Sequence, residues 1–183
     1  MILEKLKKSP SDLILLNIAA IGIIILLVIN IFVFEPLANS GFFYGNGILD
    51  FEFAWTSEQI SIIFADWGSE GMALQASGVY WDFFYIVGYS IPLFALILLF
   101  TRKLSGKIVE IGLYISLTPL VAGIFDLVEN INLLIMLNNA PDFADFVPLT
   151  ASITAFIKFG FLLVGAIFFL VVLVLTLIKR FKK

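Results

Sequence analysis

Four long apolar runs constrain this chain more than any other feature of its sequence. They cover residues 13–34, 79–100, 111–137 and 148–178. Each run is long enough to cross a hydrocarbon core of about 30 Å as an α-helix. Hydrophobic residues make up 61% of the 183 positions and charged residues only 14%, far from the composition of a soluble domain. The sequence therefore predicts an all-α membrane protein, a four-helix transmembrane bundle formed by a single domain over residues 1–183.

The basic residues fall almost entirely in three segments that alternate with the runs. Residues 5–8 precede the first run, residues 102–107 separate the second from the third, and residues 179–183 follow the fourth. Cytoplasmic loops of membrane proteins carry an excess of Lys and Arg. We therefore expect a multi-pass protein of the cell membrane with both termini in the cytoplasm. The first outer loop has no basic residue but several acids, Glu52 among them.

This outer loop, residues 36–78, has structural signals of its own. Thr56 and Gln59 have the spacing of a capping box, and apolar residues then recur at helical intervals until Gly68. The chain has three tryptophans, which are Trp55, Trp67 and Trp81. Indole rings favour the headgroup layer of a bilayer. We expect an extracytoplasmic amphipathic helix that caps the bundle between the first and second spans.

A few polar side chains interrupt the apolar runs, and they fall at similar depths. Counting about 20 residues outward from the basic end of each run brings these side chains near the outer boundary of the hydrocarbon. The residues of this polar layer are Asn30, Asp82, Tyr85, Tyr89, Asp126, Glu129, Asn130, Thr154 and Lys158. The sequence therefore predicts that the helices bring their ionisable and amide groups together in the outer leaflet.

Lys158 is the one basic residue of this layer. Its pairing decides whether these side chains face one another inside the bundle or only mark helix ends. Asp126, Glu129 and Asn130 share one face of the third helix by their spacing. Charged groups near hydrocarbon turn toward protein partners, so we expect Lys158 to pair with Asp126 or Glu129. At least one carboxyl group is then left without a cation. The alternative is that Asp82, Glu129 and Lys158 only mark helix ends at the headgroup level.

Several short motifs resemble those of a protein family. The most specific is D-x-x-E-N in the third run, from Asp126 to Asn130. The others are Leu49-Asp50-Phe51, Trp55, Trp67-Gly68, Gly71, Asp82-Phe83-Phe84, Tyr89 and Lys158-Phe159. Together they resemble small four-span prokaryotic integral membrane proteins of unknown function over residues 49–159. The resemblance implies a four-helix architecture and supplies no catalytic residue.

The residue types that are missing narrow the classes of function. The chain has no cysteine and no histidine, which excludes thiol nucleophiles, histidine-based catalysis and ordinary transition-metal sites. We expect no metal, no cofactor and no nucleic-acid partner, and we favour binding over catalysis. The expected partners are membrane lipids and a small amphipathic ligand. A homo-oligomer is compatible with the sequence, but no feature indicates one.

The polar layer is the predicted ligand-binding site. Apolar walls with a few convergent polar groups suit a lipid-like or small amphipathic molecule. Three alternatives remain open. The protein is an intramembrane lipid-modifying enzyme, with Glu129 as base and Asp126 as acid, or a subunit of a proton- or cation-linked transporter, or an accessory protein that assembles with a partner.

Overall fold

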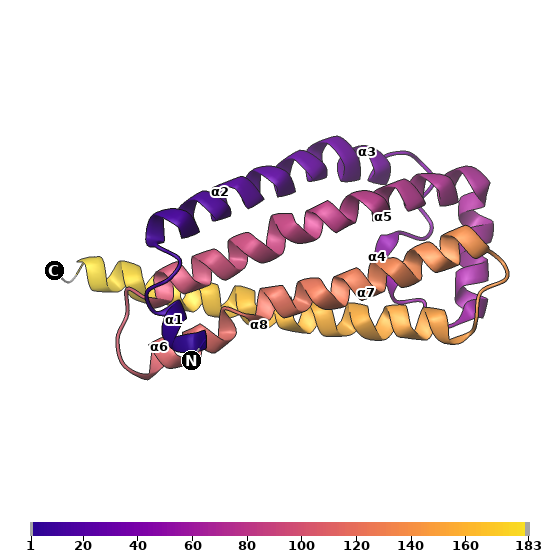
Figure 1. The fold of residues 1–183 in the computed structure, drawn as a ribbon. Helices are drawn as coiled ribbons and strands as arrows, with labels where there is room; N and C mark the ends of the chain where they lie inside the picture. Colours follow the sequence, from indigo (N-terminus) through magenta and orange to yellow (C-terminus); the bar gives the residue numbers. More distant parts are fainter. Residues whose placement is uncertain (1, 182–183) are drawn as a thin grey trace.

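The computed structural model describes residues 2–181, and within that range the chain is helical and contains no β-strand. Its elements are α1 (Ile2–Leu6), α2 (Asp12–Ile29), the π-helix η1 (Asn30–Phe34), α3 (Glu35–Ala38), α4 (Ile48–Glu52), α5 (Ser57–Thr101), α6 (Lys107–Ile115), α7 (Thr118–Asn139) and α8 (Phe146–Phe181). The long helices lie side by side in one elongated bundle (Figure 1). The predicted all-α four-helix bundle is confirmed.

Four helical stretches are long and apolar enough to cross a membrane. They are Asp12–Ala38, Ser57–Thr101, Lys107–Asn139 and Phe146–Phe181. Large apolar side chains on their outer faces are exposed, for example Phe32 at 72% and Leu163 at 61%. Extended apolar surfaces of this kind mark contact with a membrane or with another protein. The outer surface of the bundle therefore suits a bilayer.

Helices α2 and α5 pack against each other at very short range. A Cβ atom added to Gly88 would overlap the backbone of Leu26, and one added to Gly22 would overlap the ring of Pro92. Small residues at a helix interface let two backbones approach closely, which is a common basis of helix association in membranes. Helix α5 in turn packs against α7 and α8, so it lies between α2 and the rest of the bundle.

The basic segments gather at one end of the bundle. The guanidinium group of Arg102 donates hydrogen bonds to the backbone oxygens of Leu6 and Pro10, which ties the N-terminal segment to the end of α5. The ammonium group of Lys179 donates to the backbone oxygen of Lys103 at 2.8 Å. Three segments far apart in the sequence thus meet at this end.

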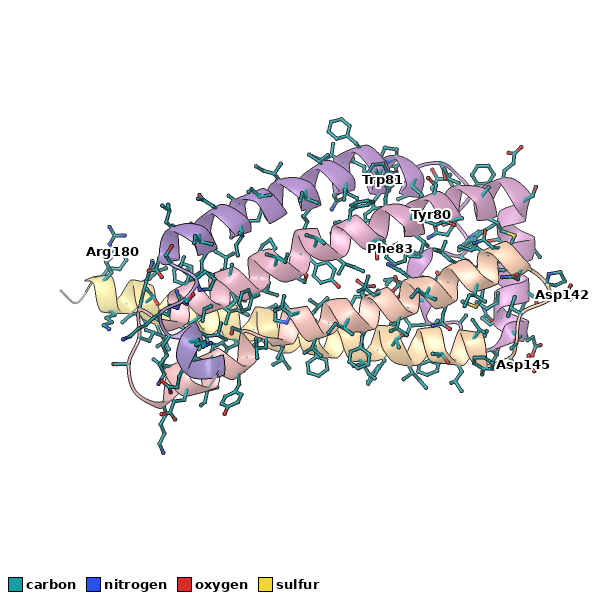
Figure 2. All side chains as sticks on the ribbon, viewed as in Figure 1. Tyr80, Trp81, Phe83, Asp142, Asp145 and Arg180 are labelled. Carbon is teal, nitrogen blue, oxygen red and sulfur yellow. The ribbon has the colours of Figure 1, made fainter. Side chains whose placement is uncertain are left out.

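The acidic loop between α7 and α8 lies at the opposite end. Figure 2 shows Arg180 at the basic end, and Asp142 and Asp145 at the other. The first part of α5 runs across the bundle there (Figure 1). The hydroxyl group of Ser57 donates to Oδ1 of Asp145 at 2.8 Å, which attaches this part of α5 to the loop before α8.

Helix α5 consists of two helical parts joined at Gly68. The side chain of Thr56 accepts a hydrogen bond from the backbone N–H of Gln59, so the helix begins where the capping spacing predicts. Gly68 has φ 62° and ψ −178°, a conformation that favours glycine, and the helix axis changes direction there. The second part extends to Thr101 and starts well before the apolar run predicted from residue 79. The side of the membrane on which the first part lies stays a prediction.

An aromatic cluster fixes α4 against the first part of α5. The Trp67 side chain is almost fully buried, and its ring packs edge-on with Phe51 at 5.3 Å and with Phe43 at 5.1 Å between centroids. Its indole N–H donates to the backbone oxygen of Asn46 at 2.7 Å. Edge-on aromatic pairs add to the stabilisation that burial gives. The cluster therefore holds α4 in a defined position, together with Glu52 at the end of this helix.

Candidate functional site

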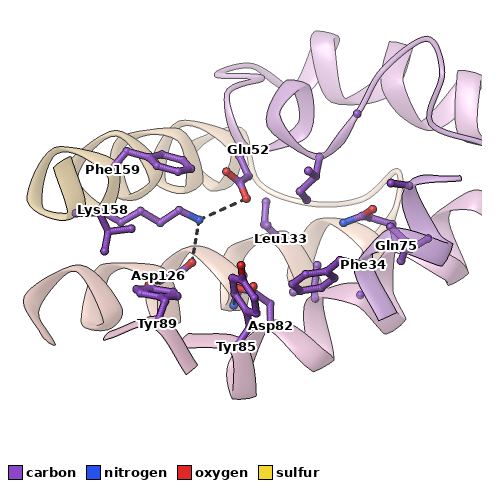
Figure 3. Close-up of a pocket in the computed structure, with 18 of the residues that line it drawn as sticks. Phe34, Glu52, Gln75, Asp82, Tyr85, Tyr89, Asp126, Leu133, Lys158 and Phe159 are labelled. Carbon is purple, nitrogen blue, oxygen red and sulfur yellow. Dashed lines mark hydrogen bonds and ion pairs between the residues drawn. The ribbon is translucent and has the colours of Figure 1, made fainter. Parts of the chain in front are cut away.

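Lys158 is the centre of a buried ion-pair network. Its Nζ atom lies 2.9 Å from Oδ1 of Asp126, 2.9 Å from Oε1 of Glu129 and 3.4 Å from Oε1 of Glu52. All four residues are at most 8% exposed. Figure 3 shows the contacts with Asp126 and Glu52. A single ammonium group thus links α4, α7 and α8.

The position of Glu52 depends on contacts between its backbone and α8. The hydroxyl group of Ser152 donates to the backbone oxygen of Glu52 at 2.8 Å, and it accepts from the backbone N–H of Trp55 at 3.0 Å. Ser152 and Lys158 are both on α8 and both buried. The same helix therefore holds the backbone of Glu52 and pairs with its carboxyl group.

Two further hydrogen bonds join α5 to this network. The hydroxyl group of Tyr89 donates to Oδ2 of Asp126 at 2.6 Å, so both oxygens of that carboxyl group have partners. The amide nitrogen of Asn130 donates to Oδ2 of Asp82 at 2.7 Å. No Lys or Arg of residues 2–181 lies within ion-pair distance of Asp82. Asp82 therefore has an amide as its partner in place of a cation.

A cavity of about 700 Å³ lies beside the network (Figure 3). Most of its wall is apolar, with Phe34 and Leu37 on one side and Phe159 and Leu162 of α8 on another. The polar side chains of the wall are Glu52, Gln75, Asp82, Tyr85, Tyr89, Asp126, Asn130 and Lys158. Small-molecule sites are typically about 300–1,000 Å³ in volume and mostly apolar, with a few convergent polar groups. The cavity has these properties.

Phe34 lines the cavity from the end of the π-helix η1. Pro36 has no N–H to donate, and just before it the backbone N–H of Glu35 bonds to the oxygen of Asn30, five residues earlier. The ring of Phe34 packs edge-on against Tyr85, with 5.0 Å between centroids.

Two acceptor atoms at the cavity wall lack hydrogen-bond partners. Oε2 of Glu52 and Oε1 of Gln75 are buried, and neither has a partner in the part of the chain that the structure describes. A buried acceptor without a donor costs about 1–3 kcal/mol. Burial raises the pKa of the Glu52 carboxyl group above its ordinary value, and the ammonium group of Lys158 opposes that shift. Both side chains belong to residues that line the cavity, although these two oxygen atoms themselves are buried.

Six of the nine residues of the predicted polar layer line the cavity. They are Asp82, Tyr85, Tyr89, Asp126, Asn130 and Lys158. The other three are placed differently. Glu129 is fully buried and reaches the site through Lys158, Thr154 donates to backbone oxygens of its own helix, and Asn30 is exposed at the start of η1. Whether any of these residues binds a ligand stays a prediction.

Several wall residues were not predicted, and Glu52 is the most important of them. It lies in the segment interpreted as an outer loop, yet it is buried and paired with Lys158. A signal was present, because Glu52 stands between Phe51 and Phe53 in a short apolar stretch. Gln75 is also buried at the wall, one turn before Gly78.

The described chain, residues 2–181, contains no group of three or more acidic residues arranged to hold a metal ion. Comparisons with family models, with curated proteins and with solved structures find no match for this chain. The resemblance to four-span prokaryotic membrane proteins therefore stays a prediction, and what the structure shows of it is the presence of four helices able to span a membrane.

Proposed function

We propose that this chain is a multi-pass membrane protein that binds a lipid-like or small amphipathic molecule in the cavity beside Lys158. The observation that carries the proposal is the combination of an apolar cavity of about 700 Å³ with polar side chains from α4, α5, α7 and α8 on its wall. An amphipathic molecule matches both parts of this wall. Its apolar part contacts residues such as Phe34 and Leu162, and its polar part contacts the network around Lys158.

The proposed orientation places the basic end in the cytoplasm and the cavity in the outer half of the bundle. It is supported by the Lys and Arg residues that meet at one end and by the acidic loop at the other. Cytoplasmic loops are enriched in basic residues. A ligand would then enter from the outer leaflet or from the extracytoplasmic side.

The geometry of the network favours binding over acid–base catalysis. An acid–base pair needs two carboxyl groups in environments that push their proton affinities apart. Asp126 and Glu129 are both 2.9 Å from the same ammonium group, so neither stands apart as a free base. Toward the basic end the bundle contains a packed apolar core that includes Leu98 and Leu113. Because this core offers no polar path through the described part of the bundle, it favours binding over transport.

The proposal is tested by photolabelling with a diazirine derivative of dodecanol. Leu162 lines the cavity, whereas its neighbour Leu163 is 61% exposed on the outer face of α8. Leu162→Trp should fill part of the cavity, and Leu163→Trp is the matched control. We expect wild type and Leu163→Trp, in phosphatidylcholine nanodiscs, to be labelled at cavity residues such as Leu133, and Leu162→Trp to lose this labelling. Equal labelling of Leu133 in all three proteins would overturn the proposal.

A further inference from the structure

The ammonium group of Lys158 has one N–H donor for each of the three carboxyl groups around it. Its Nζ atom donates to Oδ1 of Asp126, Oε1 of Glu129 and Oε1 of Glu52. Each carboxyl group thus has one oxygen bound to the same cation and a second oxygen that needs a donor from elsewhere. For Asp126 this donor is the hydroxyl group of Tyr89, 2.6 Å from Oδ2.

The second oxygen atoms of Glu52 and Glu129 have no such donor. Both Oε2 atoms are buried, and neither has a hydrogen-bond partner within residues 2–181. The two side chains lie against each other, close enough for a hydrogen bond between their carboxyl groups. A carboxylate oxygen accepts but does not donate, so two ionised carboxyl groups would leave both atoms unpaired. A protonated carboxyl group has an O–H that donates, so one proton between the two atoms satisfies both.

The charge of the cluster also favours a shared proton. The titratable groups that face Glu52 and Glu129 are Lys158 of α8, Asp126 of α7, and Asp82 and Tyr89 of α5. Among residues 2–181, Lys158 is the one cation within ion-pair distance of the two carboxyl groups, and it is shared with Asp126. A desolvated carboxyl group without a cation of its own takes up a proton, and two carboxyl groups in one site do not readily ionise together. One proton on the pair therefore lowers the buried charge.

Contacts of α4 keep the carboxyl group of Glu52 beside Glu129. The hydroxyl group of Ser152 donates to the backbone oxygen of Glu52. Phe51, the preceding residue, is fully buried and packs edge-on against Trp67. Moving the two carboxyl groups apart would break these contacts, so protonation relieves their repulsion at a lower energetic cost.

We propose that Glu52 and Glu129 share one proton between their Oε2 atoms at neutral pH. This proton joins α4, which contributes Ile48 and Glu52 to the cavity wall, to α7. Loss of the proton at alkaline pH leaves two carboxylates that repel each other at this junction, so the pair is a pH-sensitive link within the wall. The inference goes beyond the proposed function and holds whether or not a ligand occupies the cavity.

Infrared spectroscopy of the full chain in phosphatidylcholine nanodiscs tests the shared proton. A protonated carboxyl group has a C=O stretching band that a carboxylate lacks, and exposed glutamates are ionised at neutral pH. Labelling the glutamate side chains with ¹³C shifts their part of this band. The difference between labelled and unlabelled protein therefore cancels the contributions of lipid esters and of aspartates such as Asp82.

The variants are Glu52→Gln, Glu129→Gln and the control Glu58→Gln, which changes an exposed residue in the first turn of α5. A glutamine amide donates an N–H to the remaining carboxylate, so either cavity variant removes the need for the proton. We expect the protonated glutamate band in wild type and in Glu58→Gln at neutral pH, and its loss in both Glu52→Gln and Glu129→Gln.

Two results would overturn the inference. The first is a wild-type protein without a protonated glutamate band at neutral pH, a result that does not depend on the folding of any variant. The second is a band that survives in either folded cavity variant, because the proton would then belong to one carboxyl group alone. The photolabelling of the cavity is a separate measurement, so a failure of the proposed function is recognised independently.

Discussion

Lys158 and Asp126 face each other from α8 and α7, with 2.9 Å between the ammonium nitrogen and Oδ1. The second oxygen of Asp126 accepts from Tyr89 on α5, so one carboxyl group joins three helices. Glu129 lies at the same distance from Lys158 and is fully buried. The stability of the bundle and the shape of the cavity therefore both depend on one ammonium group.

Replacing Lys158 should destabilise the fold strongly. Lys158→Met keeps an unbranched apolar stem but leaves Asp126, Glu129 and Glu52 without their cation. Removing one partner of a buried ion pair typically costs about 3–5 kcal/mol. We expect a loss of that size in the free energy of unfolding, measured by denaturant titration in mixed micelles. Lys107→Met changes an exposed residue at the start of α6 and is the control. A similar small effect for both variants would show that the network contributes little.

The close contact between α2 and α5 should be intolerant of a single methyl group. A Cβ atom on Gly88 would overlap the backbone of Leu26 and force the helices apart, whereas one on Gly160 of α8 meets nothing within 4 Å. We expect Gly88→Ala to lower the unfolding free energy by about 1–3 kcal/mol. Gly160→Ala should be neutral or stabilising by up to about 1 kcal/mol, because alanine favours the helix. The same titration checks both. A tolerated Gly88→Ala would contradict the close approach of α2 to α5.

Glu52 should make stability depend on pH with a defined sign. Its raised pKa means that the folded protein holds the proton more tightly than the unfolded chain does. The contribution to stability is therefore fully present below the ordinary value of 4.5 and is lost as the pH rises toward the folded value. Glu52→Gln has no carboxyl group that titrates at this position, so it does not lose this contribution to stability. Its melting temperature relative to wild type should therefore increase as the pH rises from below 4.5 to neutrality.

Thermal unfolding across that pH range, followed by circular dichroism, checks the prediction for Glu52. Glu58→Gln is the matched control, since Glu58 is exposed on the first turn of α5. Two variants that follow the same course with pH would show that the burial of Glu52 has no energetic consequence.

The orientation in the membrane can be tested without removing any native thiol, since the chain has no cysteine. Ser105→Cys places a thiol in the exposed loop at the basic end, and Asp142→Cys places one in the exposed loop between α7 and α8. We expect a membrane-impermeant maleimide added to intact cells to label Asp142→Cys and not Ser105→Cys, and both to react after permeabilisation. The reverse pattern would invert the proposed topology.

The fold was largely predictable because the length of each apolar run and the basic residues at its ends are local features of the sequence. The apolar runs locate the helices, and the hydroxyl group of Thr56 marks the start of α5. The second part of α5 begins before the apolar run that starts at residue 79, and hydropathy alone does not indicate this helix start. Residues 69–78 contain polar side chains such as Gln75, which is buried by tertiary contacts that hydropathy does not register.

The candidate site was predictable where its residues share a helix face. Asp126, Glu129 and Asn130 follow from the period of α7, and Lys158 was the only basic residue available to them. Glu52 was not predictable in this way, because a nonlocal contact between its backbone and Ser152 brings it to the site. Phe34 reaches the cavity wall from η1, and apolar periodicity does not indicate the π-type hydrogen bonding of that segment.

A crystal structure grown from a lipidic mesophase tests whether the polar side chains of separate helices converge on one ligand cavity. We expect Lys158 between Asp126 and Glu129, with elongated electron density in the cavity between Phe34 and Leu162. A structure in which Lys158 points to the acyl chains, or in which side chains fill the cavity, would contradict it.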